Sequence, residues 1–417
     1  MTTTNEALPE KKFTSYQVLV IILLALTQFT VILDFMVMSP LGDMLMKSMS
    51  LSTSQFGFAV SGYALSAGAS GLLTAGFADK FDRKKLLLFF YIGFITGTLL
   101  CGLSTSYFML LTARIITGIF GGVIGSISMA IMADLFPLHQ RGRAMGFMQM
   151  GFGASQVLGI PISLYIANVW GWKSPFIMIV GLGAIIWLFV MLKMRPVSQH
   201  LHLKTEKTAI THFWHTFIKR DYRTGFLLTS LLSLGGFMMM PWGSAFAVNN
   251  LHVSYKQLPA LFMASGLAAL FIMPLVGKLS DKIDKVKIFT VAAISMMIII
   301  IVYTNLKPIP FAYIVMLNIV MMTAIMSRIV PAMALVSALP KMQDRGAFMS
   351  INSSLQQIAG GIAAGIGGII VVQQTKTSPL QHYNTLGYVI VVIIIANIFQ
   401  MFRVSNLIKA KKHAEQL

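Results

Sequence analysis

The sequence predicts an all-α membrane protein in which twelve transmembrane helices form two six-helix bundles related by a pseudo-two-fold axis. Three observations lead to this fold class: an apolar composition, twelve apolar blocks of membrane-crossing length, and polar loops that recur about half a chain apart. Hydrophobic residues make up 56% of the 417 residues and charged residues only 11%, whereas soluble domains carry about 25% charged residues. This composition excludes a soluble fold.

The apolar blocks set the expected helices, because a transmembrane helix needs roughly 20 mostly apolar residues. Charged breaks or breaks rich in glycine and proline separate the spans 16–45, 54–78, 86–103, 107–135, 143–167, 174–193, 224–247, 259–278, 287–304, 310–338, 346–371 and 384–403. The longest polar connection divides them six and six. We therefore expect an N-terminal bundle (1–193), a cytoplasmic central loop (194–223) and a C-terminal bundle (224–417). Residues 212–217 fit either an amphipathic turn on the membrane surface or a plain linker.

The basic residues predict the orientation of the chain. Of the 32 lysines and arginines, 25 fall on the side that holds both termini, 5 fall on the opposite side, and Arg114 and Arg328 lie inside spans. By the positive-inside rule both termini are cytoplasmic, and we expect a multi-pass protein of the inner (cytoplasmic) membrane. The net charge of +19 belongs to these loops. It does not form a basic face with interleaved aromatic residues, so no nucleic-acid partner is expected.

Matching loops indicate an internal repeat. Asp-Lys-x-Asp units begin at Asp79 and at Asp281, 202 residues apart, and Arg-Gly pairs begin at Arg141 and at Arg345, 204 residues apart. Two halves with matching loops are typical of a parallel repeat about an axis normal to the membrane. In that architecture a solute binds near the midplane between the halves, and rocking of the halves alternates access to it.

The loop motifs resemble those of the major facilitator superfamily. Gly76–Lys85 resembles the motif Gly-x-x-x-Asp-Arg-x-Gly-Arg-Arg between helices 2 and 3. It departs from the motif because its glycine stands three residues before Asp79 instead of four, and because Lys80 and Asp82 replace an arginine and a glycine. The second copy keeps the four-residue spacing. The resemblance covers nearly the whole chain and implies a transporter that is usually monomeric.

Two helix motifs resemble a subfamily, the twelve-helix drug:H⁺ antiporters. Arg114–Gly118 is similar to the helix 4 motif Arg-x-x-x-Gly of proton-coupled members. Gly153–Pro161 is similar to the glycine and proline motif of helix 5, and Gly171–Phe176 also resembles that subfamily. The resemblance implies coupling of solute movement to protons.

Asp34 is the residue expected to carry a proton. It is the one acid placed well inside an expected span, and all eight histidines fall in loops or tails. A charge at a helix centre costs roughly 2.5–3.5 kcal/mol on insertion scales, so such a residue usually has a function and a partner. Arg114 matches Asp34 in depth, and we expect it to stabilise the carboxylate until protonation or substrate releases the pair. The alternative is a permanent pair that only locks the bundle.

Arg328 is the second buried charge, and no acid in the C-terminal half matches its depth. It could bind an anionic substrate group, help to gate the inner half, or reach toward the cytoplasm along its stem. The other candidates for lining a substrate cavity are polar or aromatic: Gln28, Gln149, Gln156, Trp242, Asn352 and Gln356.

The polar loops also supply candidate gate residues. In the family that the sequence resembles, the loop after helix 2 pairs with the neighbouring helix end and stabilises the outward-open state. That implies a gate made by Asp79 and Arg83 with Asp134, and a counterpart at Asp281. The alternative for these charges is ordinary anchoring at the cytoplasmic side. We expect Gly159 and Pro161 to add a kink that matters for rocking.

The predicted function is secondary transport without a cofactor or bound metal. The leading hypothesis is proton-coupled efflux of small amphiphilic compounds. Its rivals are specific export or import of a metabolite, sugar or lysolipid-like amphiphile, and uncoupled facilitation. An enzyme is disfavoured because the spans contain no metal-ligand spacing, nucleophile–base arrangement or phosphate-binding loop. A channel fits the repeat with paired loops less well than alternating access does.

Overall fold

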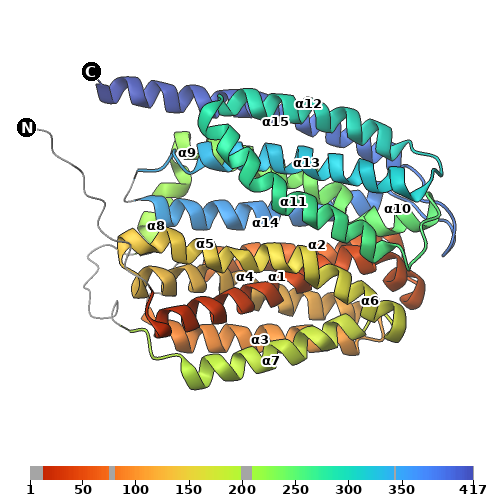
Figure 1. Cartoon of the computed structure of the whole chain (residues 1–417), viewed down its shortest axis with the longest axis horizontal. Coiled ribbons are helices and arrows are strands. Elements are labelled where there is room, and N and C mark those ends of the chain that lie inside the picture. The colour runs from red at the N-terminus through yellow and green to blue at the C-terminus, as the bar shows by residue number, and fades with distance from the viewer. Residues whose placement is uncertain (1–12, 75–79, 199–208, 342–343, 417) are drawn as a thin grey trace, which may run out of the picture.

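The computed structural model describes residues 13–74, 80–198, 209–341 and 344–416, and these ranges are mostly helical. Figure 1 shows long helices that run side by side, with the first half of the chain (red to yellow-green) in the lower bundle and the second half (green to blue) in the upper bundle. Within the described ranges, β-structure is limited to one isolated bridge between Val372 and Gln381.

The first half begins at a helix with a capping box, in which Thr14 and Gln17 exchange side-chain and backbone hydrogen bonds. Such a box satisfies backbone N–H groups that have no partner in the first turn. The elements that follow are α1 (Ser15–Met49), α2 (Thr53–Thr74), α3 (Arg83–Leu103), α4 (Tyr107–Leu135), α5 (Leu138–Ala154), η2 (Ser155–Gly159), α6 (Ile160–Trp170) and α7 (Ser174–Lys193).

The second half repeats the pattern after a short connecting helix. Its elements are α8 (Ala209–Ile218), α9 (Arg220–Met239), η4 (Met240–Trp242), α10 (Gly243–Asn249), α11 (Leu258–Lys282), α12 (Lys285–Thr304), α13 (Phe311–Val336), α14 (Arg345–Ile370) and α15 (Tyr383–Gln416). The segment predicted as a central loop over 194–223 therefore contains α8 and the start of α9. Trp214 on α8 is exposed, and its ring stacks on Phe217.

The twelve predicted spans are confirmed as helices. Eleven stretches of the described chain are long and apolar enough to cross a membrane, by length and composition alone. The remaining expected span, 346–371, is α14, which is as long as the others but carries Asn352, Gln356 and Gln357 together with several glycines. A helix of that composition gains from packing inside a bundle more than from facing lipid.

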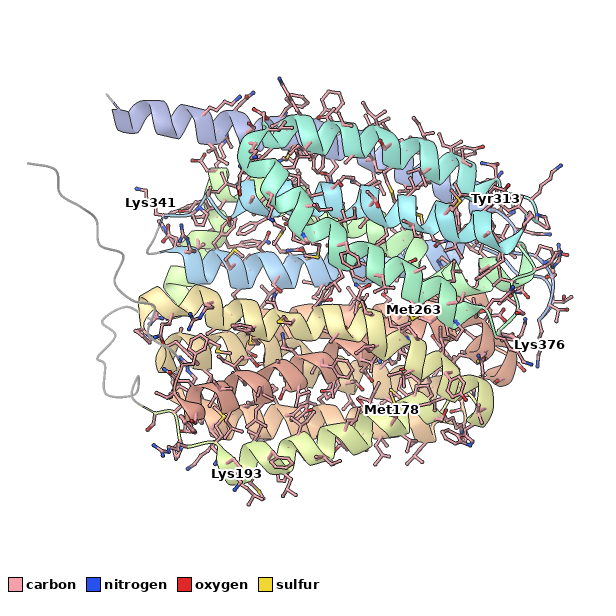
Figure 2. The ribbon with its side chains drawn as sticks, in the orientation of Figure 1. Met178, Lys193, Met263, Tyr313, Lys341 and Lys376 are labelled. Carbon is pink, nitrogen blue, oxygen red and sulfur yellow. The ribbon has the colours of Figure 1, made fainter. Side chains whose placement is uncertain are left out.

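Lysines lie at both ends of the bundle. We call the end where α1 begins and α15 ends the terminal end, and the opposite end the far end. Figure 2 shows Lys193 and Lys341 at the terminal end (left) and Lys376 at the far end (right). Met263 and Tyr313 lie between the two ends, nearer the far end.

The two halves meet along α2 and α14, where glycines remove the side chains that would hold the helices apart. A methyl group added at Gly57 would lie 2.9 Å from the Ala364 carbonyl oxygen, and one added at Gly68 would lie 2.8 Å from the Ser354 carbonyl oxygen. Small residues allow this close approach of membrane helices. The contact runs along most of α2, from its far end toward its terminal end.

The fifth span is interrupted by a π turn, η2, just before Pro161. Proline lacks a backbone N–H and its ring clashes with the carbonyl four residues earlier, so the helix must widen or bend there. Gly159 in this turn packs against α1, since a methyl group on it would lie 2.7 Å from a Leu33 side-chain carbon. Gly159 and Pro161 therefore shape the span at its contact with α1.

The repeated loop has the same structural role in both halves. Asp82 caps α3 by accepting a hydrogen bond from the Lys85 amide at 2.9 Å, and Asp284 caps α12 by accepting one from the Val286 amide at 2.7 Å. The second acid of each Asp-Lys-x-Asp unit is thus a helix N-cap. The first acid of the second unit, Asp281, is exposed near the end of α11.

We predict that Asp82→Ala and Asp284→Ala each destabilise the protein by about 1 kcal/mol, the usual cost of losing an N-cap. The measurement is the apparent unfolding temperature of the detergent-solubilised protein. Asp281→Ala is the matched control, because it removes an acid from the same motif without removing a cap. Equal unfolding temperatures for all three variants would show that the caps do not contribute.

Candidate functional site: a buried ion pair and a lock between the halves

A buried ion pair joins Asp34 on α1 to Arg114 on α4. Arg114 Nη1 lies 2.7 Å from Asp34 Oδ2, and neither side chain is exposed to solvent. The Thr98 hydroxyl on α3 donates a hydrogen bond to Asp34 Oδ1 at 3.1 Å. The Arg114 guanidinium lies 4.4 Å from the centroid of the Tyr63 ring on α2. Four helices of the first half therefore contribute to one polar cluster.

Glycines bring these helices close enough to form the cluster. A methyl group at Gly118, one turn after Arg114, would lie 2.3 Å from the Tyr63 carbonyl oxygen. A methyl group at Gly97 would lie 2.6 Å from Thr117 Oγ1. The Arg-x-x-x-Gly spacing thus has a direct physical meaning, because the glycine seats α4 against α2 and the arginine one turn earlier reaches the carboxylate.

Aromatic contacts connect this cluster to the second half. The Tyr63 ring packs against Phe35, the neighbour of Asp34 on α1, with ring centroids 5.1 Å apart. The Phe35 ring in turn lies 5.5 Å from that of Phe237 on α9. Phe35 therefore connects the surroundings of Asp34 to a helix of the other bundle.

A second polar cluster joins the two halves at the far end. Lys47 Nζ on α1 lies 2.8 Å from Asp43 Oδ2, and it also donates to Asn249 Oδ1 at 3.0 Å and to the Tyr255 hydroxyl at 3.1 Å. Asn249 Nδ2 and the Tyr255 hydroxyl both donate to the Asp43 carboxylate. We call these four residues the far-end lock.

The lock is largely shielded from water, since Asp43 is 1% exposed. Burial raises the pKa of Tyr255, and the Asp43 carboxylate that accepts its hydrogen bond raises it further. The phenol therefore keeps its proton near neutral pH and continues to donate to Asp43. Charge-assisted hydrogen bonds of this kind are shorter and stronger than neutral ones.

Further hydrogen bonds between the halves surround the lock. The Ser39 hydroxyl on α1 donates to the Met240 carbonyl, and the Ser244 hydroxyl donates back to the Ser39 carbonyl at 2.7 Å. The Thr53 hydroxyl at the start of α2 donates to the Val371 carbonyl at 2.7 Å. The far end of the molecule is therefore closed by polar contacts between the two bundles.

The fifth span meets α11 toward the far end. There, a methyl group at Gly266 on α11 would lie 2.9 Å from the Gln156 carbonyl oxygen of η2. Nearer the terminal end, methyl groups added at Gly146 on α5 or Gly277 on α11 would meet no atom within 4 Å. Figure 1 shows α11 diverging from α5 toward the terminal end. The closed far end is thus combined with a looser contact at the terminal end.

The predicted gate charges lie at the terminal end. Arg83 Nε lies 3.4 Å from Asp134 Oδ2, so this pair joins α3 to the end of α4 within the first half. Asp79 lies outside the described residues. Asp281 is exposed and has no ion pair within the described ranges.

A further buried acid at this end is Asp344, at the start of α14. Its carboxylate accepts hydrogen bonds from Lys219 Nζ at 2.6 Å and from the Tyr222 hydroxyl at 2.7 Å. The Lys341 amide donates to the same hydroxyl at 3.0 Å. Asp344 therefore ties the beginning of α9 to that of α14, within the second half.

The amide side chains predicted to line a cavity occupy different environments. Asn352 is buried and accepts a hydrogen bond from the Thr229 hydroxyl at 2.5 Å, and Gln356 donates to the Asn352 carbonyl one turn away. Gln156 is buried within η2, Gln28 is half-buried, and Gln149 is exposed on α5. These residues do not form one cluster of hydrogen-bonded partners.

The two remaining candidates for lining a substrate cavity are buried in the second half. Trp242 has no exposed surface and packs edge-on against Phe56 of α2, with ring centroids 5.5 Å apart. It therefore belongs to the contact between the halves near the far end. Arg328 on α13 is 5% exposed and lies over the Phe289 ring of α12.

Sequence reasoning missed the far-end lock and the role of Asp344. Asp43 and Lys47 stand four residues apart on one helix, a spacing that indicates a pair. Asn249 and Tyr255 carry no such signal, because their partners lie about 200 residues away in the sequence.

We predict that Arg114→Ala destabilises the protein by about 3–5 kcal/mol, because it leaves a buried carboxylate without its partner. The double variant Asp34→Asn/Arg114→Ala should recover much of that loss. The measurement is a double-mutant cycle on unfolding free energy in detergent. Additive effects of the two substitutions would contradict a coupled pair.

Comparisons with known proteins agree with this fold. The sequence model described as Major Facilitator Superfamily matches residues 24–404. An uncharacterized MFS-type transporter of Bacillus subtilis, YbcL, is 26% identical over 388 residues, covering 89% of this chain and 94% of the relative. Multidrug resistance protein 3 of Bacillus subtilis is 30% identical over 155 residues, covering 37% of this chain and 30% of the relative.

A solved structure is similar over nearly the whole chain. It is a bacterial homologue of the human lysosomal transporter Spinster, in an inward-facing and unoccupied conformation. Its TM-score is 0.77 at 15% sequence identity, covering 95% of this chain and 98% of that structure. The paired loops, the two six-span bundles and the family match lead to one conclusion: the chain belongs to the major facilitator superfamily of membrane transporters.

Proposed function

We propose that the protein is a proton-coupled exporter of small amphiphilic compounds that works by alternating access. The observation that carries this proposal is the fully buried pair of Asp34 and Arg114. Among the acids of the described helices, Asp34 lies farthest from a helix end. Because an ionisable residue inside a membrane is costly, it is usually retained for a function such as proton relay.

Proton binding to Asp34 would neutralise the carboxylate and remove the charge that holds Arg114. The guanidinium would then lose its strongest partner and keep the Tyr63 ring. Through Phe35, which contacts both Tyr63 and Phe237, the rearrangement would reach α9 of the second half. Loss of the ion pair is in this way linked to the rocking of one bundle against the other.

The orientation of the chain is compatible with export. By the positive-inside rule the terminal end, with its basic loops, faces the cytoplasm and the far end faces outward. The far-end lock then closes the outer side, while the looser α5–α11 contact lies on the cytoplasmic side. A state of this shape accepts a solute from the cytoplasm, as an exporter requires.

Two further observations support efflux of amphiphiles. A relative of this chain is named for multidrug resistance. In addition, the chain has 30 methionines, and methionine surfaces adapt to ligands of varied apolar shape. We place the substrate between the halves, with Gln28, Gln149, Gln156, Asn352 and Gln356 as candidate polar contacts.

The charges at the two ends act as gates in this proposal. The pair of Arg83 with Asp134, together with Asp79 and Asp281, belongs to the cytoplasmic gate. The far-end lock and Trp242 belong to the outer gate. Gly159 and Pro161 allow the fifth span to adjust between states. In this proposal the two bundles, 1–193 and 224–417, move as units and are joined through 194–223. The protein works as a monomer in the inner membrane.

We predict that amphiphilic substrates drive proton flux in proteoliposomes through the wild type but not through Asp34→Asn. Asparagine keeps the shape and a hydrogen-bonding oxygen but cannot carry the proton. Asp284→Asn, at the exposed N-cap of α12, is the matched comparison and should retain coupling, because asparagine caps a helix as well as aspartate does. Transport without proton movement, or normal coupling in Asp34→Asn, would contradict the proposal.

We predict that Tyr255→Phe weakens the far-end lock and increases opening of the outer side. The substitution removes one hydroxyl that donates to the buried Asp43 carboxylate, a hydrogen bond to a charge worth about 1.5–3 kcal/mol. The measurement is the rate at which a thiol reagent labels Ser244→Cys in a Cys101→Ser background. Tyr313→Phe, at an exposed tyrosine on α13, is the control. No change in the labelling rate would show that this hydroxyl does not hold the outer gate.

A further inference from the structure

Within the part of the chain that the structure describes, a buried cation of the second half has no charged partner. Arg328 on α13 is 5% exposed. Its Nε and Nη2 atoms are buried and have no hydrogen-bond partner. Its guanidinium lies 5.6 Å from the centroid of the Phe289 ring, which is itself fully buried on α12. A cation–π contact attracts the charge but accepts no hydrogen bond from the N–H groups in the plane of the guanidinium.

The buried arginine of the first half shows what is missing. Arg114 also lies over an aromatic ring, that of Tyr63, but it has the Asp34 carboxylate as a counter-charge at 2.7 Å. Arg328 has the ring and lacks the carboxylate. Each half thus places a guanidinium against an aromatic ring of a neighbouring helix, and only the first half supplies an acid.

No acid of the second half is placed to complete the pair. Within the described residues, its acids lie at or near the ends of helices: Asp221, Asp281, Asp284, Asp344 and Glu415. Asp344, the buried one, is already bound to Lys219 and Tyr222. Because an isolated buried cation is costly and arginine does not lose its proton in proteins, a negatively charged ligand would stabilise Arg328.

The position of Arg328 favours a ligand that arrives from the terminal end. It lies eight residues before the terminal end of α13, whereas Arg114 lies near the far end of α4. The terminal end is where α5 and α11 are loosely packed. Pro331 lies three residues further along α13 and has no backbone N–H to donate to the Ser327 carbonyl. Because this backbone hydrogen bond is absent, the helix can bend beside Arg328.

We propose that Arg328 binds the anionic group of an amphiphilic substrate, such as a sulfonate, phosphate or carboxylate. The inference rests on the proposed export function and narrows its substrate class to anionic or zwitterionic amphiphiles. A guanidinium offers two parallel N–H donors that match such oxyanions. The apolar part of the substrate would then lie among the surrounding aliphatic and aromatic side chains.

The test compares binding of two aromatic probes of similar size to the full-length protein in nanodiscs. One probe, 8-anilinonaphthalene-1-sulfonate, carries a sulfonate, and the other, N-phenyl-1-naphthylamine, is neutral. Equilibrium dialysis is run with nanodiscs that contain the protein and with nanodiscs of lipid alone. The amount of probe bound by lipid alone is subtracted. We expect Arg328→Gln to weaken binding of the sulfonate probe by about tenfold or more, as for loss of a charge-assisted hydrogen bond. Binding of the neutral probe should not change.

Arg328→Lys keeps the charge and should retain an intermediate affinity for the sulfonate probe, so it tests the proposal even if the glutamine variant unfolds. Equal loss of both probes, or no loss of either, would overturn the proposal. Lys376→Gln, which removes an exposed lysine at the far end, is the matched control and should bind both probes as the wild type does. Because nanodiscs hold no proton gradient, the result does not depend on whether the protein proves to be a proton-coupled exporter.

Discussion

The buried pair of Asp34 and Arg114 is the interaction on which the first half depends. A carboxylate and a guanidinium that are both fully buried are tolerable only when they face each other with good geometry. That requirement determines the packing around them: Gly118 seats α4 against α2, Gly97 seats α3 against α4, and Thr98 supplies a hydrogen bond to the remaining carboxylate oxygen. The same burial makes the pair sensitive to protonation, because one proton added to Asp34 removes the main attraction between its carboxylate and the Arg114 guanidinium.

The far-end lock gives the two bundles a defined relative arrangement. Asp43 and Lys47 on α1 are bound to Asn249 and Tyr255 of the other half, so that α1 contains both the proton-binding candidate and a polar contact across the interface. The two sites are nine positions apart on one helix. A shift of α1 that follows release of Arg114 would act on the lock directly, without a longer path through the protein.

The sequence was sufficient to predict the fold and part of the site. Long apolar blocks and matching loops located all twelve spans, and depth along two helices indicated that Arg114 would match Asp34. The lock could not be predicted, because Asn249 and Tyr255 have ordinary polar side chains whose partners are set by tertiary packing. The helix-capping roles of Asp82 and Asp284 were also not predicted, although an acid just before a helix is a common N-cap. The start of α9 at Arg220 was also missed, since its first turn is polar and reads as loop.

Release of protons on substrate binding tests the central claim most directly. Purified protein in weakly buffered detergent solution, with a pH indicator, is mixed with an amphiphilic substrate. If substrate displaces the proton carried by Asp34, the wild type releases protons in proportion to the substrate bound, whereas Asp34→Asn binds substrate and releases none. Equal proton release by the two proteins, or saturable binding to the wild type with no release at any pH, would contradict a proton-coupled exchange at Asp34.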